Sequence, residues 1–142
     1  MAFLYILRNA TGMTYVGVSR YPLVCLKQHN SAARSLQKHY TNRRRPWTLV
    51  AVLNGFNTRA QALRAEYMIK HLPQKIRHPV AIVARIATAQ ATCSQLLTTD
   101  ERFHDVNALA IVIWEEDLHN AVQLTTSSRG VADGGVALHF VG

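Results

Sequence analysis

The first eighteen residues constrain the fold of this chain more than any other segment. Residues 3–8 (FLYILR) and 13–18 (MTYVGV) are rich in β-branched and aromatic residues, and the Asn-Ala-Thr-Gly stretch between them is typical of a turn. This pattern predicts a β-hairpin with a four-residue loop. Because side chains alternate along a strand, we expect Phe3, Tyr5 and Leu7 to share one face.

The pairing of this hairpin decides whether its two tyrosines meet. Symmetric pairing about the turn places Leu7 opposite Thr14 or Tyr15, and Tyr5 then lies diagonal to Tyr15. A slip of one residue would turn the two phenols to opposite faces. Gly17 is expected to mark either a close backbone approach or a strand end.

The rest of residues 1–78 reads as helix, strand and helix. Pro22 suits a first helical position, and the pattern continues to about residue 36. The apolar run 47–53 predicts a central strand with Trp47 in the core. A capping box at residues 58–61 opens a second helix over 59–71, which Pro73 ends.

The second half gives weaker signals. Residues 80–97 are expected to be helical and residues 108–114 to form a strand. An acidic run at 115–117 favours a short helix through Val122, followed by a loop over 127–135. Residues 136–141 read as a last strand or a loose tail. We therefore predict an α/β (α+β) fold, in which a small, mainly antiparallel three-stranded sheet is flanked by helices and followed by a C-terminal extension.

Charge divides the chain near residue 79. Residues 1–78 contain thirteen Lys and Arg but a single acid, Glu66, whereas residues 79–142 contain three Arg and seven acids. Such a basic half favours a polyphosphate partner through charge attraction and counterion release. We expect residues 1–78 to form one domain and residues 79–142 an extension packed on it.

Glu66 stands out because a helical wheel places it between Ala62 and Leu63, inside the apolar arc of helix 59–71. A carboxylate turned toward a core must be paired, hydrogen-bonded or metal-bound, because burial of an isolated charge is too unfavourable. A salt bridge with Arg64 or Lys70 is one explanation. A role as metal ligand or catalytic acid is the other.

Several classes of protein are disfavoured. No apolar run approaches the roughly 18–20 residues that span a bilayer, so no membrane association is expected. Met1 leads directly into a strand-like run without the features of a secretory signal. Cys25 and Cys93 lack metal-ligand spacing and suggest reduced thiols, so we expect an intracellular protein, cytoplasmic or, in a eukaryotic or viral host, nuclear.

An ordered set of short motifs resembles the GIY-YIG nuclease superfamily, both its small stand-alone bacterial members and the nuclease subunit of the eukaryotic structure-selective resolvase. The first motif stands here as Phe3-Leu4-Tyr5, of which only the tyrosine matches, and the second as Tyr15-Val16-Gly17. Residues 26–30, 46–47 and 62–67 (ALRAEY) complete the set. The resemblance covers residues 3–78 and leaves 79–142 outside it.

This resemblance implies a Mg²⁺-dependent (or Mn²⁺-dependent) endonuclease that hydrolyses phosphodiester bonds of DNA, with a role in repair or recombination. It implies that Glu66 binds the divalent cation and that Tyr5 is a phenolic base or a water-positioning group. Tyr15 would contact the scissile phosphate, and His29 would assist proton transfer or hold a phosphate oxygen. An unperturbed phenol has a pKa of about 10, so a base at Tyr5 needs cations or the metal nearby, which we expect the basic half to provide.

One position departs from the family pattern. The family has an arginine one helical turn before the histidine, where this chain has Cys25. Three explanations stay open: another cation such as Arg20 or Lys27 reaches in, the protein binds DNA and cuts slowly or not at all, or the parent sequence held arginine. The rival function is a non-catalytic nucleic-acid-binding or interaction module on the same fold.

The expected nucleic-acid contacts are basic side chains of the first half: Arg20, Lys27, Arg43, Arg44, Arg45, Arg64 and Lys70. The predicted substrate is DNA, branched or single-stranded, and RNA is also compatible with this charge. The acidic residues 79–142 are expected to cover a sheet edge, mediate dimerisation or dock a protein partner.

Overall fold

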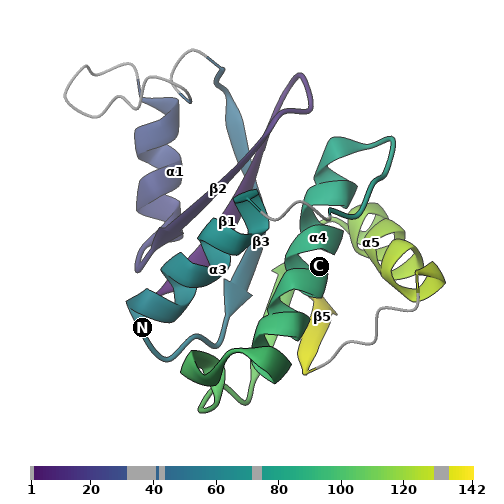
Figure 1. Ribbon diagram of the computed structural model, residues 1–142. Helices are drawn as coiled ribbons and strands as arrows, with labels where there is room; N and C mark the ends of the chain where they lie inside the picture. The colour runs from purple at the N-terminus through teal and green to yellow at the C-terminus, as the bar shows by residue number, and fades with distance from the viewer. Residues whose placement is uncertain (1, 32–40, 42–43, 72–74, 130–134) are drawn as a thin grey trace.

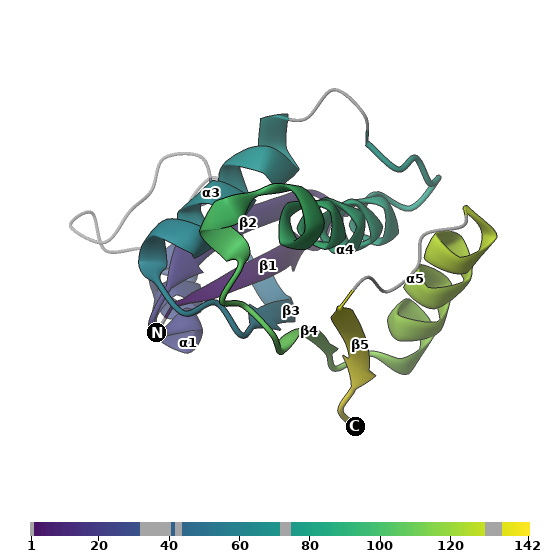
Figure 2. The same ribbon diagram turned by 60° about the horizontal axis from the view of Figure 1, so that its bottom comes forward.

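A computed structural model describes residues 2–31, 41, 44–71, 75–129 and 135–142. The described strands form one five-stranded sheet in the order β2-β1-β3-β4-β5. Helices cover both faces, with α1 on one side and α3 and α4 on the other (Figure 1, Figure 2). The predicted fold class is confirmed, and the sheet is larger than the three strands expected.

The N-terminal hairpin forms as predicted. Strand β1 (Phe3–Asn9) pairs antiparallel with β2 (Thr14–Ser19), with Leu7 opposite Tyr15 and Tyr5 opposite Gly17. In the loop, the Asn9 side-chain oxygen accepts the backbone N–H groups of Thr11 (3.1 Å) and Met13 (2.8 Å). This register puts Tyr5 and Tyr15 on one face, diagonal to each other.

Helix α1 (Pro22–Asn30) and strand β3 (Trp47–Asn54) bury one face of the hairpin. Tyr5, Leu7 and Trp47 are buried on this face against part of α1. Proline stands in the first turn of α1 as expected. The helix ends sooner than the predicted residue 36, because Ser31 is extended (ψ 140°); residues 32–36 lie outside the described residues.

Helices α3 (Arg59–His71) and α4 (Ala81–Thr99) pack against the opposite face, where Leu4 and Ile6 point. The predicted capping box is present: the Gln61 backbone N–H donates to Thr58 Oγ1, and the Thr58 N–H donates to Gln61 Oε1, both at 3.2 Å. Pro73, the predicted end of α3, lies outside the described residues.

The C-terminal half extends the same sheet. After a short 3₁₀ helix η2 (Glu101–Phe103), β4 (Leu109–Ile113) pairs antiparallel with β3, and β5 (Val136–Phe140) pairs parallel with β4. Helix α5 (Glu116–Ser128) runs past the predicted end at Val122 and into the expected loop. It continues because residue 126 is buried on the face that also carries Leu118 and Val122.

One hydrophobic core joins the two halves of the chain. It contains Ile6 and Ala65 from the basic half together with Ile86, Ile111 and Val122 from the acidic half. The sheet has five strands because β4 and β5 continue it beyond β3. Among the described helices, none is long and apolar enough to cross a membrane.

Candidate active site

The two hairpin tyrosines and the histidine of α1 form one aromatic cluster. The Tyr5 hydroxyl lies 2.9 Å from His29 Nε2, and both residues are buried. The Tyr15 ring centroid lies 4.7 Å from that of His29 and 6.3 Å from that of Tyr5. The structure therefore brings together three of the predicted catalytic residues.

Gly17 makes room for the Tyr5 ring. A Cβ atom at this position would lie 2.4 Å from Cζ and from the hydroxyl oxygen of Tyr5. The first of the two expectations for Gly17, a close approach, is therefore correct: the tyrosine ring crosses directly over the bare backbone of β2. Any larger residue at position 17 would displace the phenol.

Cys25 packs against the same cluster. It lies one turn before His29 on α1, is half-buried, contacts the buried group of Tyr5, Leu7 and Trp47, and contributes to the raised pKa of the Tyr5 phenol. The position to which the resemblance assigns an arginine therefore faces the site. A longer basic side chain at position 25 would therefore extend toward the Tyr5 phenol.

Glu66 borders the cluster from α3, a helix that packs against β2. Its Oε2 lies 3.7 Å from the Lys70 ammonium, which in turn lies 5.5 Å from the centroid of the Tyr15 ring. Glu66 lies at the border of the buried face of α3 and not inside it, and its side chain is 22% exposed. The wheel failed because the buried face of α3 is made of Gln61, Ala62, Ala65 and Ile69, and apolar Leu63 is exposed. The expected salt bridge with Lys70 is present.

Burial raises the pKa of both phenols. The pKa of Tyr5 lies far above its ordinary value of 10, mainly through desolvation, with further contributions from Cys25, Tyr15 and Glu66. Desolvation followed by the Glu66 charge raises the pKa of Tyr15. The expectation that surrounding cations would favour phenolate is therefore not met, and Tyr5 keeps its proton at neutral pH.

Sequence reasoning missed Thr41. This residue is fully buried, and its Oγ1 lies 2.7 Å from Nδ1 of His29. Its backbone carbonyl accepts a hydrogen bond from the Trp47 indole at 2.7 Å. Nothing local in the sequence marks this threonine, because its partners come from α1 and β3. Trp47 itself is buried, as predicted.

Comparison with known proteins assigns this chain to a family. Residues 1–78 match the GIY-YIG catalytic domain, which covers more than half of the chain. The chain belongs to the GIY-YIG family. This assignment supports a nuclease and agrees with the motifs at Tyr5 and Tyr15.

The similar curated proteins are named structure-specific endonuclease subunits. The SLX1 subunit of Candida dubliniensis is 32% identical over 116 residues, which cover 75% of this chain and 39% of the relative. The SLX1 subunit of Mus musculus is 31% identical over 80 residues, covering 56% of this chain and 29% of the relative. The chain thus spans about two fifths or less of the length of these relatives.

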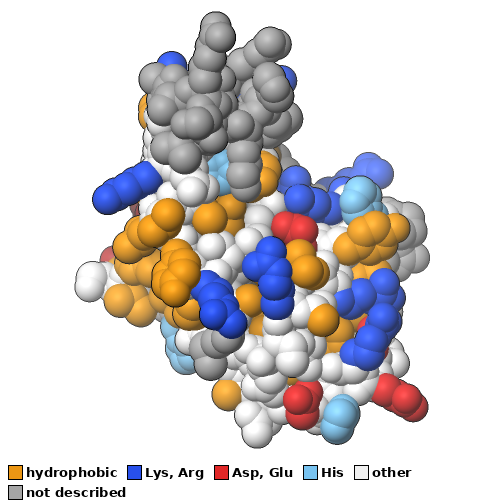
Figure 3. Space-filling view, turned by 90° about the vertical axis from the view of Figure 1, so that its left-hand side faces the viewer, with side chains coloured by type: hydrophobic (Ala, Val, Ile, Leu, Met, Phe, Trp, Pro, Cys, Tyr) orange, Lys and Arg blue, Asp and Glu red, His pale blue; other side chains and the backbone are white. Residues whose placement is uncertain are grey.

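The basic side chains of the GIY-YIG domain take several positions. Arg20, Lys27 and Arg45 are exposed, Arg44 is half-buried, and Arg43 lies outside the described residues. The carbonyl of Arg44 accepts a hydrogen bond from the Asn9 side chain at 2.9 Å. Figure 3 shows Lys and Arg side chains spread among exposed hydrophobic ones on the α1 side of the molecule, with few acidic groups between them.

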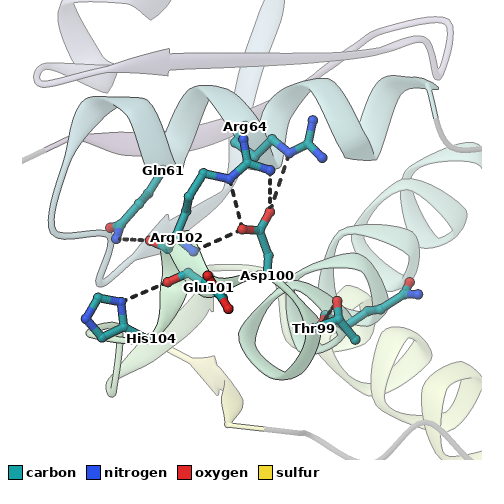
Figure 4. A network of polar contacts seen from close by, with 8 residues as sticks. Gln61, Arg64, Thr99, Asp100, Glu101, Arg102 and His104 are labelled. Carbon is teal, nitrogen blue, oxygen red and sulfur yellow. Dashed lines mark hydrogen bonds and ion pairs between the residues drawn. The ribbon is translucent and has the colours of Figure 1, made fainter.

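Arg64 is not brought to this site. Its Nε lies 3.6 Å from Asp100, which Arg102 also binds at 2.8 Å (Figure 4). Gln61, also on α3, donates to the Asp105 carboxylate at 2.8 Å. These contacts tie α3 to the acidic half, next to a polar hollow of about 480 Å³ between α3, α4 and η2. Arg64 is therefore engaged by Asp100, and its predicted contact with nucleic acid stays a prediction.

The donor set around Glu66 fits a hard cation with few protein ligands. Within the part of the chain that the structure describes, no group of three or more His, Cys, Asp or Glu could hold a metal ion. Mg²⁺ keeps several of its waters and needs only one or two carboxylates together with substrate oxygens. A single, partly exposed glutamate beside two phenols is compatible with that requirement.

Proposed function

We propose that this protein is a divalent-metal-dependent endonuclease that hydrolyses phosphodiester bonds of DNA and prefers branched substrates. The observation that carries the proposal is the cluster of Tyr5, Tyr15 and His29, which Glu66 borders through Lys70 and whose two phenol pKa values the Glu66 charge raises. Glu66 is the single acid of the basic half. The names of the SLX1 relatives support a structure-specific substrate.

Hydrolysis requires that a water oxygen bonds to phosphorus, that the bond to the leaving oxygen breaks, and that this oxygen receives a proton. Tyr5 is protonated at rest, so it cannot accept the proton of water unless its own proton moves to His29 Nε2, 2.9 Å away. The pair therefore acts as a two-member proton acceptor. His29 can later return the proton toward the leaving oxygen.

Mg²⁺ or Mn²⁺ held by Glu66 would polarise the phosphate and offset its charge. Lys70 shares the Glu66 carboxylate and lies over the Tyr15 ring, so it adds a positive charge beside the phosphate contact assigned to Tyr15. The partly exposed Tyr15 and Glu66 leave the site open to a substrate backbone. Exposed cations such as Arg20, Lys27 and Arg45 would contact neighbouring phosphates.

Cys25 makes this enzyme slow. A guanidinium at this position would form paired, charge-assisted hydrogen bonds to the phosphate, which a thiol cannot do. A second function therefore has a specific observation behind it: a domain that binds DNA through its basic surface and does not cut. Its signature would be salt-sensitive binding without metal-dependent products.

The test is cleavage of single-stranded, duplex and flapped DNA with and without Mg²⁺. We expect products only with the metal and most from the flapped substrate. Glu66→Gln should remove these products. Glu115→Gln is the control, because it also removes a carboxylate from a salt bridge, the one with Arg8, and it should leave the products unchanged. Equal products from native and Glu66→Gln proteins would refute the metal assignment, and binding without products would favour the second function.

A further inference from the structure

The imidazole of His29 is fully buried. Both ring nitrogens of this histidine have a partner, the Tyr5 hydroxyl at Nε2 and the Thr41 hydroxyl at Nδ1. Tyr5, His29 and Thr41 are all buried, with exposed fractions of 1%, 0% and 0%. In such surroundings the position of each proton is set by these partners, because an unmade hydrogen bond would be expensive.

Two proton arrangements satisfy this chain of three groups. In the first, the Tyr5 hydroxyl donates to an unprotonated Nε2, and Nδ1–H donates to the Thr41 hydroxyl oxygen. In the second, the Thr41 hydroxyl donates to an unprotonated Nδ1, and Nε2–H donates to the phenol oxygen. A phenol is a stronger donor and a weaker acceptor than an aliphatic alcohol, so the first arrangement uses the better donor and the better acceptor.

Thr41 is held in place by the residues that flank it in space. Trp47 donates its indole N–H to the Thr41 carbonyl at 2.7 Å. Asn30, which follows His29 in α1, binds the Trp47 backbone twice, accepting its N–H at 2.6 Å and donating to its carbonyl at 3.0 Å. A closed ring of contacts therefore links His29, Thr41, Trp47 and Asn30 and fixes the threonine relative to the imidazole.

We propose that Thr41 is a positioning residue that holds His29 in the Nδ1–H tautomer, with Nε2 bare and directed at the Tyr5 proton. This rests on the proposed function for its use, because only that tautomer can receive the proton of Tyr5 during hydrolysis. Thr41 does not touch the substrate. It acts through the imidazole, as partners that orient catalytic or metal-binding histidines generally do.

The first test does not depend on DNA cleavage. ¹⁵N chemical shifts of the His29 ring are measured in the full chain, without DNA or metal, at a pH where the ring is neutral, and assigned against His29→Asn. We expect a protonated Nδ1 and a bare Nε2. A native spectrum with Nε2 protonated overturns the proposal by itself, even if every Thr41 variant fails to fold.

Two variants of the same position then separate the hydroxyl from the packing. Thr41→Val keeps the shape and loses the hydroxyl, so His29 should leave the Nδ1–H tautomer. Thr41→Ser keeps the hydroxyl and should retain the native shifts. Unchanged shifts in the valine variant, or altered shifts in a folded serine variant, contradict the proposal.

Kinetics connect the tautomer to the proposed function. Thr41→Val should lower kcat by about tenfold to a hundredfold, in the range seen when the partner of an active-site histidine is removed, with KM unchanged. Thr41→Ser should restore most of the rate. If native protein shows the expected tautomer but cuts no DNA, the endonuclease assignment fails while the positioning of His29 by Thr41 stands. A valine variant with native kcat contradicts the positioning role alone.

Discussion

Helix α3 presents polar side chains to two surroundings that differ in kind. On one side, Glu66 and Lys70 face the aromatic cluster of Tyr5 and Tyr15. On the other, Arg64 pairs with Asp100 and Gln61 donates to the Arg102 carbonyl, both of the acidic half (Figure 4). Arg64 and Glu66 are two residues apart in sequence, and only their neighbours in space distinguish their roles.

The comparison contrasts the proposed substrate site with a contact that joins the two halves of the chain. Asp100 is bound by two arginines, so its charge is used within the protein. In the aromatic cluster, the buried Tyr5 and His29 lead outward to the half-exposed Tyr15, Cys25 and Glu66. A phosphate can reach the aromatic cluster. In the Asp100 network, the arginine charges are already paired with a carboxylate of the protein. Four substitutions sharpen this contrast.

The largest effect is expected from Glu66→Gln. Loss of the carboxylate that we propose as metal ligand should remove several kcal/mol of transition-state stabilisation, so cleavage should fall by about a thousandfold. Stability should change little, because the pair with Lys70 is partly exposed. Single-turnover cleavage measures the effect on activity, and urea unfolding measures the effect on stability. An equal loss of cleavage in Asp100→Asn would contradict the distinction between the two regions.

Cys25→Arg should change activity in the opposite direction. The new guanidinium would lie beside the Tyr5 hydroxyl, where it favours phenolate and binds the phosphate. We expect a gain of about a hundredfold in kcat, comparable with one well-placed donor to a developing anion. Cys25→Lys is the matched control, since it restores charge without the paired hydrogen bonds and should gain less.

Gly17→Ala should perturb both stability and activity. Its Cβ would meet the Tyr5 ring at 2.4 Å, so the phenol must move or the hairpin must shift. We expect a loss of about 1–3 kcal/mol in the free energy of unfolding, together with reduced cleavage by the folded protein. Gly12→Ala is the control: it strains the loop, where φ is +88°, but meets no atom within 4 Å. Native cleavage by Gly17→Ala would show that the phenol position is unimportant.

The smallest effect concerns the Asp100 network. Hydrogen bonds from Arg102, with the charge of Arg64, lower the pKa of Asp100 from its usual 3.8 to about 2. A carboxyl with a depressed pKa stabilises the fold above its unfolded pKa and loses this contribution as the pH falls through the folded value. Native protein should therefore lose stability between about pH 4 and pH 2 more steeply than Asp100→Asn. Parallel melting curves over this range would contradict the account, and cleavage at neutral pH should be equal in both.

Local signals predicted much of this structure. The hairpin, the proline start of α1 and the capping box of α3 depend on residues close in sequence, and all three are present. The diagonal approach of Tyr5 and Tyr15 was expected for one of the registers that the turn allows, and the structure has that register. The attachment of β4 and β5 to β3 could not be predicted, because strand order depends on contacts between distant segments.

The sequence predicted that Tyr5, Tyr15 and His29 would lie close together, but it did not predict the environment around them. A wheel cannot show that Leu63 is exposed, so it misjudged the burial of Glu66. Charge counting suggested that cations would lower the pKa of Tyr5, whereas desolvation dominates. Thr41 was not predicted, because its contact with His29 joins two segments that are separate in the sequence. Each failed prediction concerns either the burial of a side chain or a contact between residues distant in the sequence.

The central claim is that Tyr5, Tyr15, His29 and Glu66 form a metal-dependent hydrolytic site that Cys25 slows. Its most direct test is single-turnover cleavage of flapped DNA in Mg²⁺ by Cys25→Arg and by the double variant Cys25→Arg, Glu66→Gln. The account predicts rapid metal-dependent cutting by the first protein and none by the second. Absence of cutting by a folded, DNA-binding Cys25→Arg protein, or equal cutting by both, would contradict it.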